Sequence, residues 1–118
     1  MEYNEHKPIY LQNVDLMQEK IVRGEWPEEE RIVSVREMAA TGGVNPNTVM
    51  RSYERLEADG IIFNRRGIGF FVASGAKDHI KQLERKKFMD EELPKLRERL
   101  GHIGLTIDVR VAERKDEN

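Results

Sequence analysis

Apolar residues recur at helical spacing close to the start of the chain. The spacings are four, three and four positions, which places these side chains on one face of a helix. They are Tyr10, Val14, Met17 and Ile21. Pro8 suits the first turn of such a helix, because the amide hydrogen that proline lacks would have no intrahelical partner there. We therefore expect a helix that starts at Pro8 and stops at Gly24, before a turn at Trp26-Pro27.

A second helix is predicted from a capping box, Ser34-Val35-Arg36-Glu37. The Ser34 side chain can accept a hydrogen bond from the amide of Glu37, whose carboxylate reaches back to the amide of Ser34. Gly42-Gly43 should end this short helix, because glycine tolerates the left-handed conformation of a helix exit. The next helical pattern follows almost at once, so the connection is a tight turn.

The third helix should begin at Asn45-Pro46, because asparagine is a strong N-cap residue and proline fits the first helical position. Gly60 provides the stop. The apolar stripe that we expect in the core is Val49, Tyr53 and Leu56. The opposite side carries Asn47, Met50, Arg51 and Glu54. The pattern thus leaves one largely polar face of this helix free.

Two short apolar runs after this helix predict a β-hairpin with a basic tip. Residues 61–63 and 70–73 read as strands around a glycine-bearing loop that contains Arg65 and Arg66. An isolated hairpin is only marginally stable in water, so this one should lean on the helices before it.

A helical pattern returns from Ala76, and Pro94 must kink or divide it. Its apolar positions are Ile80, Leu83, Phe88, Leu96 and Leu100. Gly101 and Gly104 should break it. Beyond them two alternatives stay open, since Thr106 could cap a last short helix while the apolar alternation over 107–111 suits a strand.

The fold class that these elements indicate is mainly α with a small β-hairpin. Helix, tight turn, helix and hairpin together form a winged helix-turn-helix, which we assign to residues 1–75 as a DNA-binding domain. Residues 76–118 would form a short helical dimerisation segment, too small for an independent ligand-binding domain. With 38% hydrophobic and 36% charged residues in 118, the chain suits a small helical protein that completes its core by pairing.

Charge and composition add limits rather than a function. The net charge is −2, but residues 31–75 hold six basic and four acidic groups, a mildly basic balance that an acidic opening conceals. The chain has no cysteine, which excludes a disulfide scaffold and a cysteine zinc site. No stretch approaches 18 apolar residues, and no leader pattern is visible, so we expect a soluble, cytoplasmic protein without a membrane partner.

Catalytic and cofactor chemistry find little support in the sequence. The three histidines have no metal-ligand spacing, and the serines lack a nearby pattern of histidine and carboxylate. Gly67-x-Gly69 belongs to a turn and has no phosphate-loop lysine after it. We therefore predict no catalytic residue, metal or cofactor.

The polar face of the third helix suits nucleic acid. The second helix of a helix-turn-helix lies in the major groove with its first residues against base edges. Amide, hydroxyl and guanidinium groups are what base edges and phosphates accept. The residues of this kind are Asn45, Asn47, Thr48 and Arg51, while Met50 could touch a thymine methyl group. Arg65 and Arg66 sit where a wing tip would meet the backbone or the minor groove.

At these residues the chain resembles the GntR family of bacterial transcription regulators, and Asn45-Pro46-Asn47-Thr48 with the short C-terminal part is most like the YtrA-type subfamily. The resemblance runs from Trp26 to Val72, over about half of the chain. Besides the capping box, it rests on Gly42-Gly43-Val44, Thr48-Val49, Leu56-Glu57-Ala58-Asp59-Gly60-Ile61-Ile62 and Arg65-Arg66-Gly67-Ile68-Gly69-Phe70-Phe71-Val72.

The resemblance implies DNA contacts from the second helix start, the third helix start and the wing. The full set of candidate DNA-binding residues is Ser34, Arg36, Asn45, Asn47, Thr48, Met50, Arg51, Arg65, Arg66 and Gly67. Two departures concern specificity. Val33 stands where the family usually has proline, and Asn45-Pro46-Asn47 with Met50 replaces the hydroxyl and arginine residues of other branches, so the bases read should differ.

The resemblance also implies a dimeric repressor that occupies an operator, blocks polymerase and is released by a signal. The target would be a transporter-type operon, and the partners would be operator DNA, a second copy of the chain and an unknown small-molecule effector. The alternative function is a winged-helix module that binds protein. The free helix face argues against it, because it carries arginine and no exposed aromatic residue, whereas protein interfaces favour tyrosine, tryptophan and phenylalanine.

Overall fold

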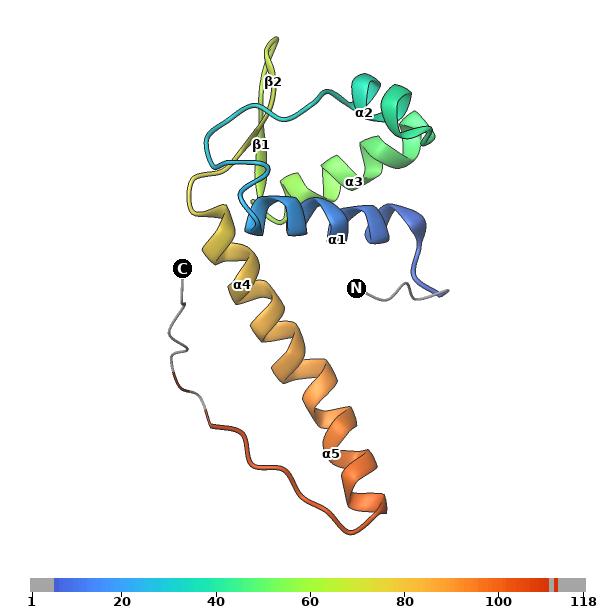
Figure 1. Cartoon of the computed structure of the whole chain (residues 1–118), viewed down its shortest axis with the longest axis vertical. Coiled ribbons are helices and arrows are strands. Elements are labelled where there is room, and N and C mark those ends of the chain that lie inside the picture. The colour runs from blue at the N-terminus through green and yellow to red at the C-terminus, as the bar shows by residue number, and fades with distance from the viewer. Residues whose placement is uncertain (1–5, 111, 113–118) are drawn as a thin grey trace. The chain divides into compact units, whose positions relative to one another are not determined.

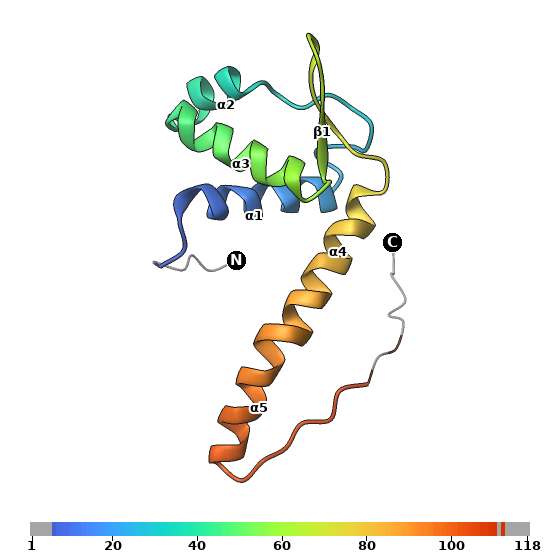
Figure 2. The ribbon, with the colours of Figure 1, turned by 180° about the vertical axis from the view of Figure 1, so that it is seen from behind.

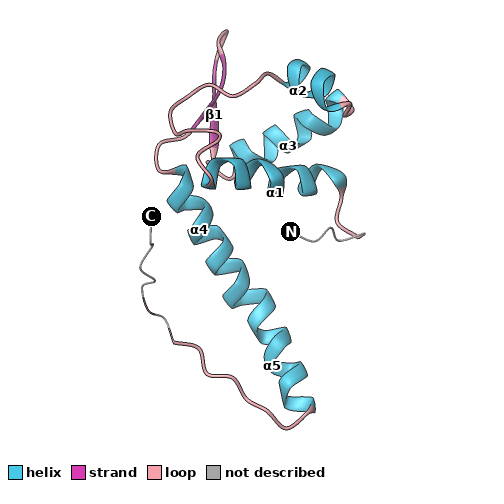
Figure 3. Ribbon diagram, in the orientation of Figure 1, coloured by secondary structure: helices cyan, strands magenta, loops and turns pink. Residues whose placement is uncertain are grey.

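The computed structural model describes residues 6–110 and residue 112, and it confirms a mainly helical chain with a small antiparallel hairpin (Figures 1 and 3). The chain divides into two compact units, residues 1–82 and 83–118. The elements are α1 (Ile9–Val22), α2 (Val35–Gly42), α3 (Pro46–Ala58), β1 (Ile62–Arg65), β2 (Gly69–Val72), α4 (Ala76–Lys87), the π-helical turn η1 (Phe88–Glu92) and α5 (Leu93–His102). Within the described residues, no helix is long and apolar enough to cross a membrane.

Helix α1 starts one residue later than the sequence predicted. Pro8 stands just outside it, and its carbonyl accepts hydrogen bonds from the amides of Leu11 and Gln12 at 3.0 and 3.1 Å. Gly24, at φ +82°, ends the helix as expected. Of the predicted stripe, Val14, Met17 and Ile21 are buried, whereas Tyr10 is only half-buried.

The caps of α2 and α3 form largely as the sequence predicted. The Glu37 amide donates to Ser34 Oγ at 3.1 Å, and the Asn47 amide donates to Asn45 Oδ1 at 2.8 Å. One detail of the capping box is different, because the Glu37 carboxylate accepts from the Ser34 hydroxyl at 3.3 Å instead of from the Ser34 amide. Gly43 takes the left-handed conformation at φ +62°, which lets α3 start almost immediately after α2.

Tyr53 connects α3 to the segments on either side of it. Its hydroxyl donates to the Val33 carbonyl at 2.7 Å, just before α2, and its ring meets Phe70 of β2 edge-on at 5.2 Å between centroids. The side chain is fully buried with Val49 and Leu56, as the stripe predicted. Burial, helped by the nearby charge of Glu37, raises the pKa of the Tyr53 hydroxyl well above its usual value. Helix α3 is therefore fixed by a neutral phenol to the rest of the first unit, residues 1–82, which we call the head.

Replacing Tyr53 by phenylalanine should cost about 1 kcal/mol at neutral pH, because the Val33 carbonyl loses its partner in a partly buried setting. The variant should also change the response to alkali. A phenol whose pKa is raised by folding contributes stability that is intact below the unfolded pKa of 10 and is lost as the pH rises beyond it. We expect the free energy of unfolding to fall above pH 10 more steeply for the unsubstituted protein than for Tyr53→Phe, in denaturant titrations. Equal slopes would contradict this role of the hydroxyl.

The hairpin is longer toward its tip than the sequence suggested. Its register runs from Ile62↔Val72 to Arg65↔Gly69, so Arg65 lies within β1 and not in the loop. The turn itself consists of residues 66–68, with the Ile68 amide bonded to the Arg65 carbonyl at 2.9 Å. Gly67 adopts φ +81°, a conformation that favours glycine.

The hairpin is supported by a segment that sequence reasoning treated as a loop. Residues 29–32 run alongside β2 (Figure 2), where the Glu29 amide donates to the Val72 carbonyl at 2.8 Å. The Ile32 amide donates to the Phe70 carbonyl at 2.9 Å, and Arg31 forms a bridge with Phe71. This third, strand-like segment makes β2 the central strand, which helps a hairpin that would be marginal by itself.

The first turns of α4 belong to the head. Ala76 and Ile80 are buried, and His79 Nε2 lies 2.7 Å from the Asp59 carbonyl oxygen at the end of α3. The Gly75 amide donates to Glu28 Oε1 at 2.6 Å. These contacts agree with a first unit that extends to residue 82.

The second unit shows how Pro94 divides the helix. The Leu93 amide donates to the Phe88 carbonyl, a bond that spans five residues and closes the π-helical turn before the proline. Proline lacks an amide hydrogen and crowds the carbonyl four residues earlier, so a widened turn relieves the clash. The helix ends between the two glycines that were expected to break it, since α5 runs one residue past Gly101 to His102 and Gly104 adopts φ +76°. Residues 105–110 form neither helix nor strand, and most of 111–115 lies outside the described residues.

Candidate nucleic-acid interface

The start of α3 presents a free amide group at the surface. Asn47 is exposed, and no hydrogen bond of its side chain is seen among the described residues. Its neighbour Asn45 uses Oδ1 for the helix cap, which leaves its amide hydrogens for a ligand. Thr48 is half-buried, whereas Met50 exposes 40% of its surface in the next turn of the helix. The arrangement offers hydrogen-bond donors and acceptors beside one apolar side chain.

Arg51 is held by an aromatic ring from a different helix. Its guanidinium carbon lies 4.1 Å above the ring centroid of Tyr10 in α1, a cation–π contact. The sequence placed Tyr10 on the apolar face of the first helix, and no local pattern indicates its contact with Arg51. Residues 41 positions apart meet only after α1 packs against α3. The contact orients the charge of Arg51 without neutralising it.

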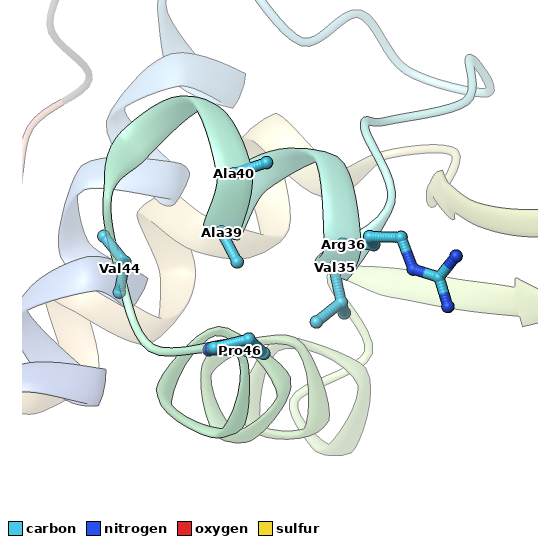
Figure 4. A pocket seen from close by; sticks show the side chains of 6 residues that line it. All are labelled: Val35, Arg36, Ala39, Ala40, Val44 and Pro46. Carbon is cyan, nitrogen blue, oxygen red and sulfur yellow. The ribbon is translucent and has the colours of Figure 1, made fainter.

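The start of α2 borders a shallow apolar depression of 540 Å³ (Figure 4). It lies between α2 and the first turn of α3, and its lining residues are Val35, Arg36, Ala39, Ala40, Val44 and Pro46. Arg36 is exposed and its guanidinium points away from the depression (Figure 4). Ser34, in contrast, has its hydroxyl committed to Glu37.

The hairpin of β1 and β2, which we call the wing, combines basic and apolar groups. Arg65 stacks over the paired rings of Phe71 and Phe63, with its guanidinium carbon 5.1 and 5.9 Å from their centroids. Arg66 and Gly67 are exposed at the turn, and Ile68 beside them leaves 54% of its surface open. In both ribbon views α2 and the wing tip lie on the same side of α1 (Figures 1 and 2).

The arginines of the head fall into two groups. Arg23 and Arg55 are each paired with a carboxylate one helical turn away, Glu19 and Asp59 respectively. Among the described residues, no ion pair is seen for the other arginines of the first unit, which are Arg31, Arg36, Arg51, Arg65 and Arg66. Positive charges without carboxylate partners on α2, α3 and the wing suit an anionic ligand such as DNA.

Sequence reasoning missed one member of this group, Arg31. It stands in the 29–32 segment, which looked like part of a loop between two helices, and only its pairing with β2 brings it to the wing. Elsewhere in the described part of the chain, there is no group of three or more histidine, aspartate or glutamate side chains that could hold a metal ion.

Comparison with known proteins bears on this surface. Residues 9–72 match the model of the bacterial regulatory proteins of the gntR family. The chain is 38% identical over 107 residues to the HTH-type transcriptional regulator YhcF of Bacillus subtilis, covering 89% of this chain and 85% of that protein. It is also 40% identical over 70 residues to the HTH-type transcriptional repressor YtrA of the same organism, covering 59% of this chain and 54% of YtrA.

A solved structure shows the same fold. A protein from Bacteroides thetaiotaomicron, described as a transcriptional regulator of the GntR family, is 48% identical and superimposes with a TM-score of 0.76. The match covers 85% of this chain and 86% of that one. It therefore extends beyond the head and includes part of the C-terminal unit.

Proposed function

The chain belongs to the GntR family of bacterial transcription regulators, and we propose that it acts as a homodimeric repressor. As a member of this family it is a DNA-binding regulator and not an enzyme. The resemblance to the YtrA-type subfamily is supported by the similarity to YtrA of Bacillus subtilis, itself a repressor. A repressor of this kind occupies paired operator half-sites and blocks transcription while it is bound. The proposed target is a transporter-type operon, and the proposed releasing signal is a small-molecule effector.

In the proposed complex the start of α3 enters the major groove. The observation that carries this assignment is the set of unpaired arginines on α2, α3 and the wing. Asn45, Asn47 and Met50 would face base edges, while Arg36 and Arg51 would contact phosphates. Arg65, Arg66 and Gly67 would meet the backbone from the wing, and Thr48 would hydrogen-bond from the half-buried edge of α3. Ser34 contributes mainly by fixing the start of α2, because its hydroxyl already serves the cap.

The proposed dimerisation element lies in the segment 76–118, and most of it belongs to the second unit, residues 83–118. Phe88, Met89 and Leu96 keep 40%, 37% and 37% of their surfaces open in a single chain, although large apolar side chains favour burial. Leu83 and Leu100 are half-buried. Ile80, in contrast, is only 3% exposed, so the proposal relies on the other positions.

The charges next to this apolar surface suit pairing with a second copy. Residues 85–87 are basic and residues 90–92 are acidic, so a twofold partner in the opposite direction would place unlike charges together. The Lys86–Asp90 bridge at 2.6 Å shows that one such pair already forms within the chain. A dimer is mechanically useful because half-sites lie about 34–36 Å apart, one helical turn of DNA.

Binding-site selection from random duplexes, using the full chain, tests the proposed function. We expect enrichment of a sequence with two inverted half-sites, bound with an affinity that falls steeply with salt concentration. Selection of no sequence, or binding that does not depend on salt, would contradict DNA recognition and favour a protein-binding role.

Arg36→Ala should weaken binding to every duplex to a similar extent, because an exposed arginine after a helix cap is placed for a phosphate and not for a base. We expect the slope of log affinity against log salt to fall by about one unit per protomer. Arg55→Ala is the matched control, since its guanidinium is paired with Asp59 at the far end of α3. A loss restricted to one base-pair position would contradict the phosphate role.

A further inference from the structure

The outer face of the wing carries two arginines, one on each side of the central strand β2. Arg31, Phe71 and Phe63 are directly opposite one another across the three paired segments. Two pairs further toward the tip, Gly69 lies opposite Arg65. Side chains on one face of a strand alternate with those on the other, so all of these positions except the glycine project from the same face.

Gly69 makes room for the Arg31 side chain. A Cβ atom at position 69 would lie 2.8 Å from Arg31 Nε and 3.4 Å from Arg31 Nη2, which is closer than side-chain atoms normally approach. The guanidinium of Arg31 therefore lies directly over the backbone of β2. Gly69 also has φ +142°, a conformation that other residues rarely adopt.

Arg65 reaches the same place from the opposite strand. Its guanidinium carbon is 5.1 Å from the ring centroid of Phe71, the residue that pairs with Arg31. The stacked rings of Phe63 and Phe71, 5.7 Å apart between centroids, form an apolar floor under it. The guanidinium of Arg31 thus lies at Gly69 and that of Arg65 lies over Phe71, on the same face of β2. The described residues supply no carboxylate to either.

Two like charges held close together repel each other unless an anion lies between them. Guanidinium groups are planar and bind phosphate oxygens through paired hydrogen bonds, and aromatic faces hold them in a fixed orientation. The wing belongs to the unit that carries the recognition helix. The anion within reach of such a wing is the DNA backbone.

We propose that Arg31 and Arg65 together clamp one backbone phosphate of the operator. The clamp rests on the proposed function and adds Arg31, from the 29–32 segment, to the DNA-contacting residues. The 29–32 segment would then contribute to DNA binding as well as supporting β2. Because a phosphate carries no sequence information, the clamp strengthens binding to every duplex and fixes the position of the wing.

The test compares Arg31→Gln, Arg65→Gln and the double variant in the full chain. The probes are a duplex selected by the unsubstituted protein and a scrambled duplex of equal length, each titrated over a range of salt concentrations. Each single variant should bind both duplexes roughly tenfold more weakly, as expected for the loss of a charge-assisted hydrogen bond. The salt slope should change little while one arginine still neutralises the phosphate, and it should fall by about one unit per protomer in the double variant.

Arg23→Gln is the matched control, because that arginine is exposed on α1 and paired with Glu19. It should bind like the unsubstituted protein. Arg31→Lys serves as a second variant that keeps the charge, and it should retain the salt slope while losing part of the affinity. Thermal melting of every variant separates a lost contact from a lost fold.

Binding of Arg31→Gln at the unsubstituted level would overturn the proposal. A fall of about two units per protomer in the double variant would overturn it as well, since it would mean that each protomer contacts two separate phosphates. If the unsubstituted protein itself shows no salt-dependent binding to DNA, it is the proposed function that fails. The two failures are therefore distinguishable in one data set.

Discussion

Replacing Phe88 and Leu96 together by aspartate is expected to turn the proposed dimer into a folded monomer and to weaken binding to a paired operator by at least about a hundredfold. Both side chains are exposed in the single chain, by 40% and 37%, and both lie in the second unit, so the change should leave the head intact. In the proposed dimer each contributes roughly 1.5–3 kcal/mol of burial, and an aspartate there would have to be buried without a partner. The second head then no longer binds at high effective concentration, and the affinity falls to that of one head.

Light scattering and gel shifts on the same samples measure this effect. Ile9→Asp is the matched control, because Ile9 is an apolar residue with 66% of its surface open at the start of α1 in the head. It should stay dimeric. On a duplex with a single half-site the double variant should bind as well as the unsubstituted protein does. A double variant that remains a dimer with normal affinity would show that the second unit pairs in another way or binds a different partner.

Asn47→Ala is expected to relax base preference at one symmetric position in each half-site, by roughly 1–3 kcal/mol of discrimination. The side chain lies in the first turn of α3, it is exposed, and no hydrogen bond to it is seen in the described part of the chain. An asparagine amide can make a paired hydrogen bond to adenine in the major groove, and no other base offers the same donor and acceptor. The cap of α3 should survive, because Asn45 accepts from the backbone amide of residue 47 and not from its side chain.

Repeating the binding-site selection with the variant measures the change position by position. Gln82→Ala, which removes an exposed amide group from α4, is the control and should leave the preference unchanged. The salt slope of Asn47→Ala should also stay the same, since no charge is lost. An unaltered preference in the variant would assign the readout to Met50, Arg51 or the wing.

The sequence alone was sufficient for the features that depend on a few neighbouring residues. The caps at Ser34 and Asn45, the left-handed exit at Gly43 and the buried stripe of α3 all follow from local backbone geometry and helical spacing. So does the interruption before Pro94, although the π-helical form of that interruption was not predicted. The polar face of α3 followed in the same way, because it is the other side of the same helix.

Tertiary structure alone decided the features that join distant parts of the chain. Arg51 and Tyr10 meet because α1 packs on α3, and Arg31 joins the wing because the 29–32 segment pairs with β2. The 29–32 segment has no strong local signal, since a short strand-like segment with charged residues resembles a loop until its partner is known. Ile80 looked like part of a surface for pairing, yet it is buried within one chain because α4 starts inside the head. Periodicity shows which face of a helix is apolar, and only packing determines what covers that face.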